Sequence, residues 1–200
     1  FFERYAQGES SLRVHSERPA HKALMDAMAE RNMTKRMVYA SSFADAPNYG
    51  WWSRPERGGL AISDGAILVV VGMRFSDKAT RDKFVELTNG HAEYCLANEP
   101  DTLIYSGGFA NSDNDRADIK EGDLLFVMAC SDKAAVDKHS NDPQHIALGP
   151  KFLEAGVSSE RTFMKTYRTT GYGFKHQLRT YSGQAWNAQS EVQSGGGRRR

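Results

Sequence analysis

The sequence has little cysteine, almost no net charge and no long hydrophobic run. Two cysteines in 200 residues cannot form a disulfide framework. As ordinary thiols, they favour a reducing compartment such as the cytoplasm or the interior or surface of an organelle. The net charge of +1 gives no reason to expect nucleic acid or an anionic membrane as a partner. The longest apolar run, Ala66–Met73, is too short to cross a bilayer. These properties are typical of a soluble globular protein.

Motifs for cofactors and metals are also missing. The sequence shows no phosphate-binding loop, no nucleophile elbow and no Cys/His cluster at metal-ligand spacing. The acidic stretch at 111–123 lacks the glycine and the terminal glutamate of a calcium-binding loop. We therefore expect no cofactor, no haem and no structural metal.

The most regular part of the chain runs from about residue 64 to 170. Its periodicity predicts strand, helix, strand, strand, helix and strand in that order. This order is that of ferredoxin-like α+β folds, in which helices cover one face of an antiparallel sheet. Ser76 is the predicted N-cap of the first helix, and Asp142-Pro143 restarts the second helix after a break. The predicted strands are 66–75, 102–109, 124–130 and 161–170, and the helices are 76–97 and 131–140, with the restart after it.

Two segments of the chain repeat the same unusual spacing. "HSERPAH" occupies residues 15–21 and "HSNDPQH" occupies residues 139–145. At this offset of 124, Phe1–Leu24 lies against Leu125–Leu148 without a gap and with seven identities in 24 positions, where chance gives roughly one or two. The match predicts an internal repeat, of which residues 1–43 form the second half of an incomplete first copy.

This repeat sets the expected organisation of the whole chain. Phe1–Ala6 is the first predicted strand, Glu9–Glu30 a helix broken at Pro19, and Lys35–Phe43 the second strand. The first half of this copy, about 57 residues (124 − 67), would lie upstream or on another chain. The apolar side chains of residues 1–43 should then pack on the sheet of the complete unit and close most of a barrel. The expected parts are 1–43, a Gly/Pro/Trp-rich linker at 44–63, the complete unit at 64–170 and a polar tail at 171–200.

The complete unit resembles antibiotic biosynthesis monooxygenase (ABM)-type domains. "HAEYCLANEPDTLIY" (91–105) is similar to the Glu-Pro-Gly-Thr-Leu-x-Tyr junction of that family, with Asp101 where glycine is usual. "LFVMACSDKAAVDKH" (125–139) resembles its strand-to-helix segment, and "HSNDPQHIAL" (139–148) its His, small cap, Pro, His signature. The resemblance implies a dimeric α+β barrel, formed here by pseudo-symmetric tandem repeats. The family holds quinone-forming oxygenases without a cofactor, haem-degrading enzymes and members with no known activity.

Six residues are candidates for a site. His91, His139 and Tyr105 are the candidate catalytic residues, because imidazole and phenol groups beside an apolar sheet can move protons. His145, Trp51 and Trp52 are the candidates for substrate binding. Each has a structural alternative: the histidines could be satisfied polar groups at a helix break or face, Tyr105 a core residue, and the two tryptophans plugs at a barrel end.

Two functions are compatible with these residues. The first is a cofactor-independent monooxygenase that acts on a small aromatic or polyketide-like compound. The second is a non-catalytic accessory or scaffold subunit of a larger complex, such as an organellar, photosynthetic or respiratory assembly, which the absence of tryptophan from residues 64–170 favours. In either case, the expected partner of the sheet face is the chain's own repeat or a second subunit.

Overall fold

A five-stranded antiparallel sheet forms the centre of the molecule. The computed structural model describes residues 3–5, 7–33, 41–57, 62 and 64–170. The strand order is β1-β3-β4-β2-β5, and the last four strands of this series have the ferredoxin-like arrangement. The predicted α+β class is therefore confirmed. Within the described residues the sheet stays open, so the expected closed barrel is not formed there. The strands are β1 (Phe43–Trp51), β2 (Ile67–Phe75), β3 (Thr102–Ala110), β4 (Leu124–Cys130) and β5 (Ser159–Arg168).

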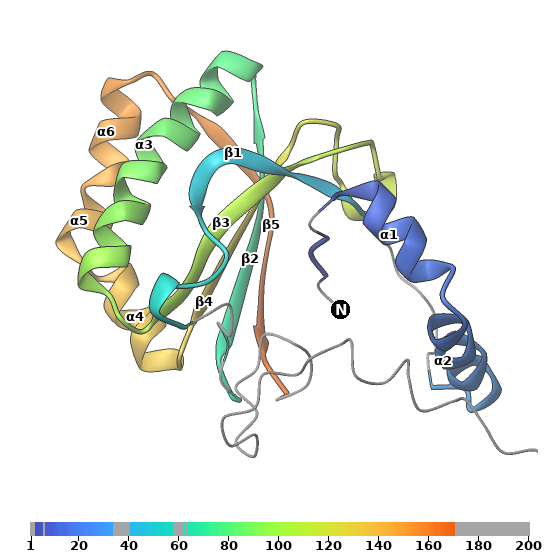
Figure 1. Ribbon diagram of the computed structural model, residues 1–200. Coiled ribbons are helices and arrows are strands. Elements are labelled where there is room, and N and C mark those ends of the chain that lie inside the picture. The colour runs from blue at the N-terminus through green and yellow to red at the C-terminus, as the bar shows by residue number, and fades with distance from the viewer. Residues whose placement is uncertain (1–2, 6, 34–40, 58–61, 63, 171–200) are drawn as a thin grey trace, which may run out of the picture.

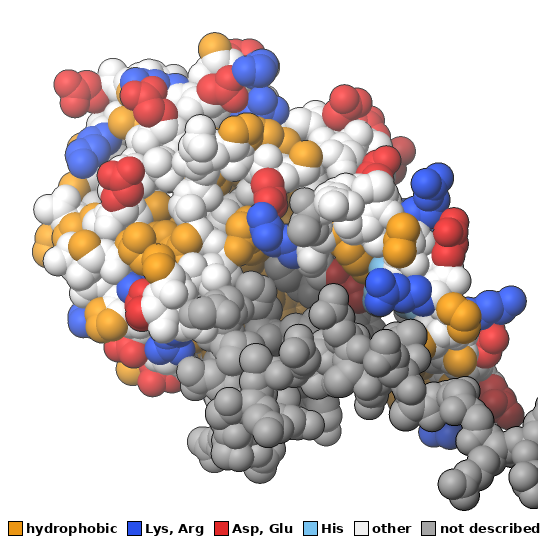
Figure 2. Space-filling model, in the orientation of Figure 1, with side chains coloured by type: hydrophobic (Ala, Val, Ile, Leu, Met, Phe, Trp, Pro, Cys, Tyr) orange, Lys and Arg blue, Asp and Glu red, His pale blue; other side chains and the backbone are white. Residues whose placement is uncertain are grey.

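Four helices cover one face of this sheet, and two more lie on the other side (Figure 1). The covering helices are α3 (Lys78–Asn98), α4 (Lys133–Ser140), α5 (Pro143–Ile146) and α6 (Leu148–Glu154). The two on the other side are α1 (Glu9–Ser16) and α2 (Pro19–Glu30). None of the helices in the described ranges is both long and apolar enough to cross a membrane. Figure 2 shows acidic and basic side chains mixed over the visible face, without a large area of one sign.

Alternation along the central strands divides the core into two clusters. Between the sheet and α3, the odd-numbered residues of β2 and the even-numbered residues of β4 pack together, with Val69 and Leu124 as examples. On the opposite face, Val127 packs with Leu103 and Ile104. Both clusters contain fully buried side chains, which explains why β2 and β4 are almost continuously apolar.

Local side-chain hydrogen bonds decide where the covering helices begin. The N-cap of α3 is Asp77, whose carboxylate accepts from the Thr80 backbone N–H at 2.8 Å. The prediction of Ser76 was wrong by one residue, because its hydroxyl donates to the Asp77 carboxylate. The predicted restart is present: Asp142 caps α5 by accepting from the Gln144 N–H at 2.8 Å, and Pro143 occupies the first turn.

The expected linker at 44–63 contains a strand. β1 pairs antiparallel with β3 and supplies the partners that this edge of the sheet would otherwise lack. Its irregular middle contains Gly50, which has φ 57°. A Cβ atom there would lie 1.8 Å from the Tyr105 carbonyl oxygen, so only glycine permits this close approach. Pro47, Gly50 and Trp51 of this segment therefore belong to a bulged edge strand.

The two N-terminal helices have the boundaries that the repeat predicts but not the packing. α1 and α4 begin and end at positions 124 apart, and α2 and α5 both begin at a proline at that same offset. However, α1 and α2 bury no residue, and Leu12 and Leu24 are exposed. The expected docking of these helices on the sheet is therefore wrong for the described residues. The predicted strand at 1–6 is not formed at residues 3–5. Residues 1, 2, 6 and 34–40, and the tail at 171–200, lie outside the described part.

Candidate functional site

The inner face and the C-terminal end of α3 carry three polar residues spaced four apart in the sequence. His91 and Cys95 lie one above the other on the helix, and Glu99 follows as its C-cap. All three are almost fully buried against the sheet, at 5%, 0% and 5% exposure. Such a column of buried polar groups is unusual in a helix–sheet interface and requires partners.

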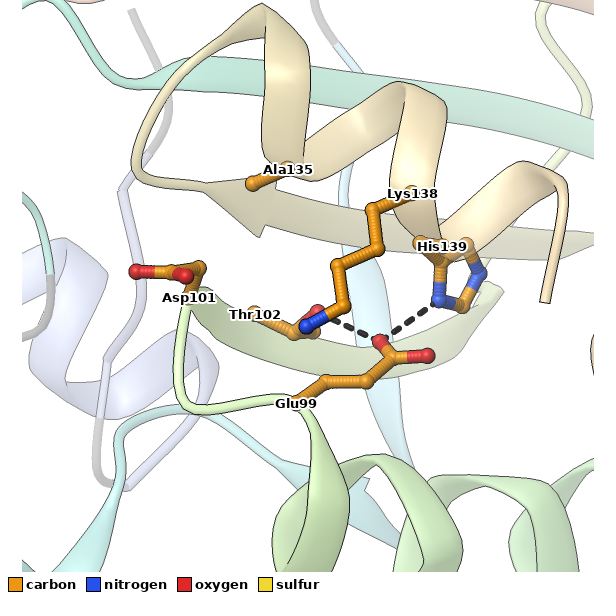
Figure 3. A pocket seen from close by; sticks show the side chains of 6 residues that line it. All are labelled: Glu99, Asp101, Thr102, Ala135, Lys138 and His139. Atoms are coloured by element: carbon orange, nitrogen blue, oxygen red, sulfur yellow. Dashed lines mark hydrogen bonds and ion pairs between the residues drawn. The ribbon is translucent and has the colours of Figure 1, made fainter.

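Glu99 finds its partners on β3 and α4. Its Oε2 accepts a hydrogen bond from the Thr102 hydroxyl at 2.7 Å and lies 2.8 Å from Nδ1 of His139 (Figure 3). Although burial by itself raises the pKa of Glu99, the hydrogen bonds of His139 and Thr102 lower it to about 2. The carboxylate is therefore ionised, and Nδ1 of His139 is the donor to it. In the neutral form of the ring, this hydrogen bond leaves Nε2 of His139 as the nitrogen with a free lone pair.

Two more histidines lie against His139. The ring centroid of His145, on α5, is 4.5 Å from that of His139, and His91 is 5.3 Å from both rings. α5 is held in place from α3, since the Tyr94 hydroxyl donates to the Asp142 carboxylate at 3.0 Å. We call His91, His139 and His145 the histidine cluster. Its three imidazoles come from three different helices.

Burial keeps His91 and His145 uncharged. The pKa of His91 is lowered to about 4, first by burial and then by the neighbouring His139 and His145. The pKa of His145 is lowered for the same two reasons, burial and the proximity of His139. At neutral pH these two rings are neutral imidazoles that can accept a proton or bind a metal ion.

Aromatic rings close the cluster on the sheet side. The Tyr105 ring lies edge-on to His91 at 5.9 Å, and Trp51 stacks on Tyr105 at 5.8 Å. Burial raises the pKa of Tyr105 well above its usual value, so its hydroxyl stays protonated. Nε1 of Trp51 is buried without a hydrogen-bond partner among the described residues.

The cysteine in the column is not a candidate nucleophile. Sγ of Cys95 lies 3.4 Å from Nε2 of His91 and 3.7 Å from Nδ1 of His139. Burial raises the pKa of the thiol, as does the Glu99 carboxylate, so the reactive thiolate does not form at neutral pH. Cys95 and Cys130 are both free and buried.

The hollow beside the Glu99–His139 pair is small. Its volume is about 10 Å³, which is room for about one water molecule. Figure 3 shows its lining, with Asp101, Ala135 and Lys138 around the hydrogen-bonded pair. A larger hollow of about 230 Å³ lies elsewhere, beside Phe75, Arg81 and Gly122, and it contains both acidic and basic groups. The histidine cluster is thus closely packed in this conformation.

The structure brings together five of the six residues that the sequence suggested. His91, His139, His145, Tyr105 and Trp51 lie in contact between the sheet and the helices. Trp52 lies on the opposite face of the sheet, in the second core cluster, where the Arg4 guanidinium is 5.4 Å from its ring centroid. Adjacent strand residues point to opposite faces, so the two tryptophans could not both reach the cluster.

Sequence reasoning missed two residues that shape the site. Glu99 stood in the junction before Pro100 and was not recognised as a partner for His139, although it continues the four-residue column of His91 and Cys95. Arg54 is 3% exposed and donates to the carbonyl oxygens of Thr102, Leu96 and Cys95 at 2.7, 2.9 and 3.0 Å. It also donates to the Glu99 carbonyl. No local pattern distinguishes Arg54 from a surface arginine, because its partners lie more than 40 residues away.

Comparisons with known proteins gave structural likenesses only. No protein-family model matches the chain, and no curated protein matches it in sequence. A proposed antibiotic biosynthesis monooxygenase of Caulobacter crescentus matches 54% of this chain and 92% of its own, at 18% identity and a TM-score of 0.42. A proposed monooxygenase of Lactobacillus acidophilus matches 54% of this chain but only 45% of its own, at 16% identity and a TM-score of 0.40. HapK of Hahella chejuensis matches 54% and 96%, at 15% identity and a TM-score of 0.41. Each of these likenesses covers about half of this chain.

Proposed function

We propose that the protein is an ABM-like monooxygenase that oxidises a small aromatic or polyketide-like phenol at the histidine cluster. The observation that carries the proposal is the buried Glu99–His139 pair, with an Nδ1–Oε2 distance of 2.8 Å. A carboxylate that holds one imidazole nitrogen orients the ring and makes the other nitrogen a better proton acceptor. The neutral His91 and the protonated Tyr105 hydroxyl lie beside it as further groups for proton transfer.

The proposed reaction needs only a base, O2 and a phenol whose anion delocalises its negative charge into the ring. Nε2 of His139 takes the proton of a phenolic hydroxyl, and the electron-rich ring carbon para to it forms a C–O bond with O2. Loss of water from the resulting hydroperoxide yields a quinone, so one phenol and one O2 become one quinone and one water. Low polarity around the cluster favours the step, because water does not compete for the anion.

The substrate would enter by movement of the shortest covering helix. α5 has four residues, and its Ile146 side chain is 60% exposed, so few contacts hold its outer side. A shift of α5 would enlarge the hollow beside His139 without disturbing the sheet. Trp51 would then stack on a planar substrate, with His145 at the entrance.

Oxygen consumption by the full chain, with a panel of phenols and 1-naphthols whose para carbon carries a hydrogen atom, tests the proposal. A chelator is present throughout, and isotope-labelled O2 shows whether one oxygen atom enters the product. His139→Gln should lower turnover at least about 100-fold, since general base catalysis contributes 10²–10⁴. His21→Gln is the matched control, because it removes a histidine that lies outside the histidine cluster, on α2. Unchanged turnover in His139→Gln, or no oxidation of any compound, contradicts the proposal, and the second result leaves the accessory role as the alternative.

A further inference from the structure

Three imidazoles from α3, α4 and α5 converge on one point. One ring nitrogen from each of His91, His139 and His145 lies within 4.8 Å of the others. Around a tetrahedral ion with metal–nitrogen bonds of 2.0–2.1 Å, ligand nitrogens lie about 3.4 Å apart. Binding would therefore draw the three nitrogens closer together than they lie in the metal-free protein. We propose that the histidine cluster is a binding site for one divalent transition-metal ion, with Zn²⁺ as the representative.

An unsatisfied buried nitrogen supports this site independently of the spacing. Nδ1 of His145 is buried and has no hydrogen-bond partner among the described residues. A buried ring nitrogen without a partner is unfavourable, and native proteins normally avoid it. Among the described residues, the hydrogen-bond partner of Nε2 of His91 is the Cys95 sulfur at 3.4 Å, which is a weak partner. A bound ion would use both nitrogens.

His139 already has a carboxylate hydrogen-bonded to one ring nitrogen, as metal-binding histidines usually have. His139 donates from Nδ1 to the Glu99 carboxylate, and the Thr102 hydroxyl holds the same oxygen. A carboxylate in this position fixes the ring and leaves Nε2 as the ligand atom. Glu99 and Thr102 are thus positioning residues for the metal site, and Arg54 holds the carbonyl oxygens of both.

The donor set determines the class of ion. Three imidazoles suit Zn²⁺, Cu²⁺, Fe²⁺ or Ni²⁺, whereas Ca²⁺ and Mg²⁺ prefer oxygen ligands. Three protein ligands leave the fourth position of a tetrahedral site for water or an anion. Cys95, Glu99 and His139 form a second possible group of ligands. Binding there would break the Glu99–His139 hydrogen bond and require a buried thiol to ionise, so the histidine cluster is the better site.

This inference departs from the expectation that the chain binds no metal. His139 and His145 are six residues apart across a proline, which is not a standard ligand spacing, and the third ligand comes from a distant helix. The inference does not rest on the proposed oxygenation, because metal binding is measured directly. A bound ion would occupy Nε2 of His139, so metal loading should inhibit the proposed oxygenation. Metal binding and oxygenation are measured separately, so a negative result for one does not affect the test of the other.

Titration of the metal-free full chain with Co²⁺ and Zn²⁺ tests the site. We expect one ion per chain by calorimetry, and visible d–d absorption of four-coordinate Co²⁺ without a thiolate charge-transfer band. Failure of the wild-type protein to bind either ion, or a strong thiolate band, overturns the assignment. The spectrum of the wild-type protein decides this point without any variant.

Matched variants locate the ion. His145→Ala should weaken Zn²⁺ binding well over tenfold, and Glu99→Gln should weaken it 10–100-fold with the same stoichiometry. His21→Ala is the control, because the His21 ring also packs on a histidine, His15, at 4.8 Å, outside the histidine cluster. Cys95→Ala should not change affinity. If Cys95→Ala abolishes binding and His145→Ala does not, the ion binds at the second group and the proposal is wrong.

Discussion

Arg54 joins three backbone segments around the histidine cluster. Its guanidinium group donates to carbonyl oxygens in the last turn of α3, at the helix C-cap Glu99 and at the start of β3. These are carbonyls that a helix end leaves without partners. Its planar group also lies over the Trp51 ring at 5.7 Å. One side chain from the segment before the main domain thus fixes the end of α3 from which Glu99 reaches His139.

Replacement of Arg54 should therefore destabilise the fold strongly. Arg54→Met should lower the free energy of unfolding by about 3 kcal/mol or more, since each buried carbonyl left without a donor costs about 1–3 kcal/mol. Urea unfolding measures this change. Arg57→Met is the matched control and should stay within about 0.5 kcal/mol of the wild type. Equal stability of the two variants would show that Arg54 does not hold the end of α3.

At the scale of elements, acidic caps define the starts of α3, α4 and α5. Asp77, Asp132 and Asp142 each accept a hydrogen bond from a backbone N–H in the first turn. The pKa of Asp77 is lowered, first by the Thr80 N–H and then by the Ser76 and Thr80 hydroxyls. A carboxyl with a lowered folded-state pKa stabilises the fold above its unfolded pKa of about 3.8, and this contribution is lost as the pH falls through the folded value.

This linkage predicts a stability difference that depends on pH. Asp77→Asn keeps a capping acceptor without the charge, so the variant should be less stable than the wild type at neutral pH. The difference should close at a pH well below 3.8, where the wild-type carboxyl is protonated as well. Chemical denaturation at both pH values measures it, with Asp26→Asn on α2 as a control for the loss of one negative charge. A difference that persists unchanged in acid would rule out the charge as its source.

The internal repeat predicted from the sequence corresponds to two similar helix pairs. The helix pair α1–α2 has the boundaries of α4–α5, and His15 packs on His21 at 4.8 Å as His139 packs on His145 at 4.5 Å. The flanking strands of the first copy fall mostly outside the described residues. The division into 1–43, 44–63, 64–170 and 171–200 therefore stays a prediction.

At the scale of the whole molecule, the described chain has one packed body and one exposed helical pair. The body is the five-stranded sheet with α3–α6, and the pair is α1–α2, which buries no residue (Figure 1). Arg4 connects the N-terminal segment to the body through an ion pair with Asp45. Apolar side chains are exposed on the pair, and what covers them stays a prediction. The exposed side chains are Leu12, Val14, Leu24 and Met25.

Substitution of one leucine in the packed body and one in the helical pair compares how much each part contributes to stability. Leu103→Ala, at 0% exposure in β3, should cost about 2–5 kcal/mol of unfolding free energy. Leu24→Ala, at 54% exposure in α2, should change stability by at most about 0.5 kcal/mol in dilute monomer. Thermal and urea unfolding measure both, together with solution mass. A large loss in Leu24→Ala at low concentration would mean that α2 is packed in the monomer.

The sequence was most informative where the physics is local. Alternation and apolar runs located β2 and β4 to within one residue, and the Asp142-Pro143 start of α5 follows from capping rules. Predictions became less accurate where an element depends on a distant partner. β1 was taken for a linker, because its bulge and its Gly, Pro and Trp residues hide the alternation of an edge strand.

The sequence alone determined the fold class and the candidate residues, because periodicity, caps and histidine spacing are encoded over short distances. It identified His91, His139, His145, Tyr105 and Trp51 one by one. Only the tertiary structure decided that they meet, since α3 and α4 pack on the same face of the sheet and bring Glu99 to His139. The structure also showed that Trp51, and not Trp52, faces the histidine cluster, and it assigned Arg54 to the end of α3. These outcomes depend on contacts between residues 40 or more positions apart, which no local pattern specifies.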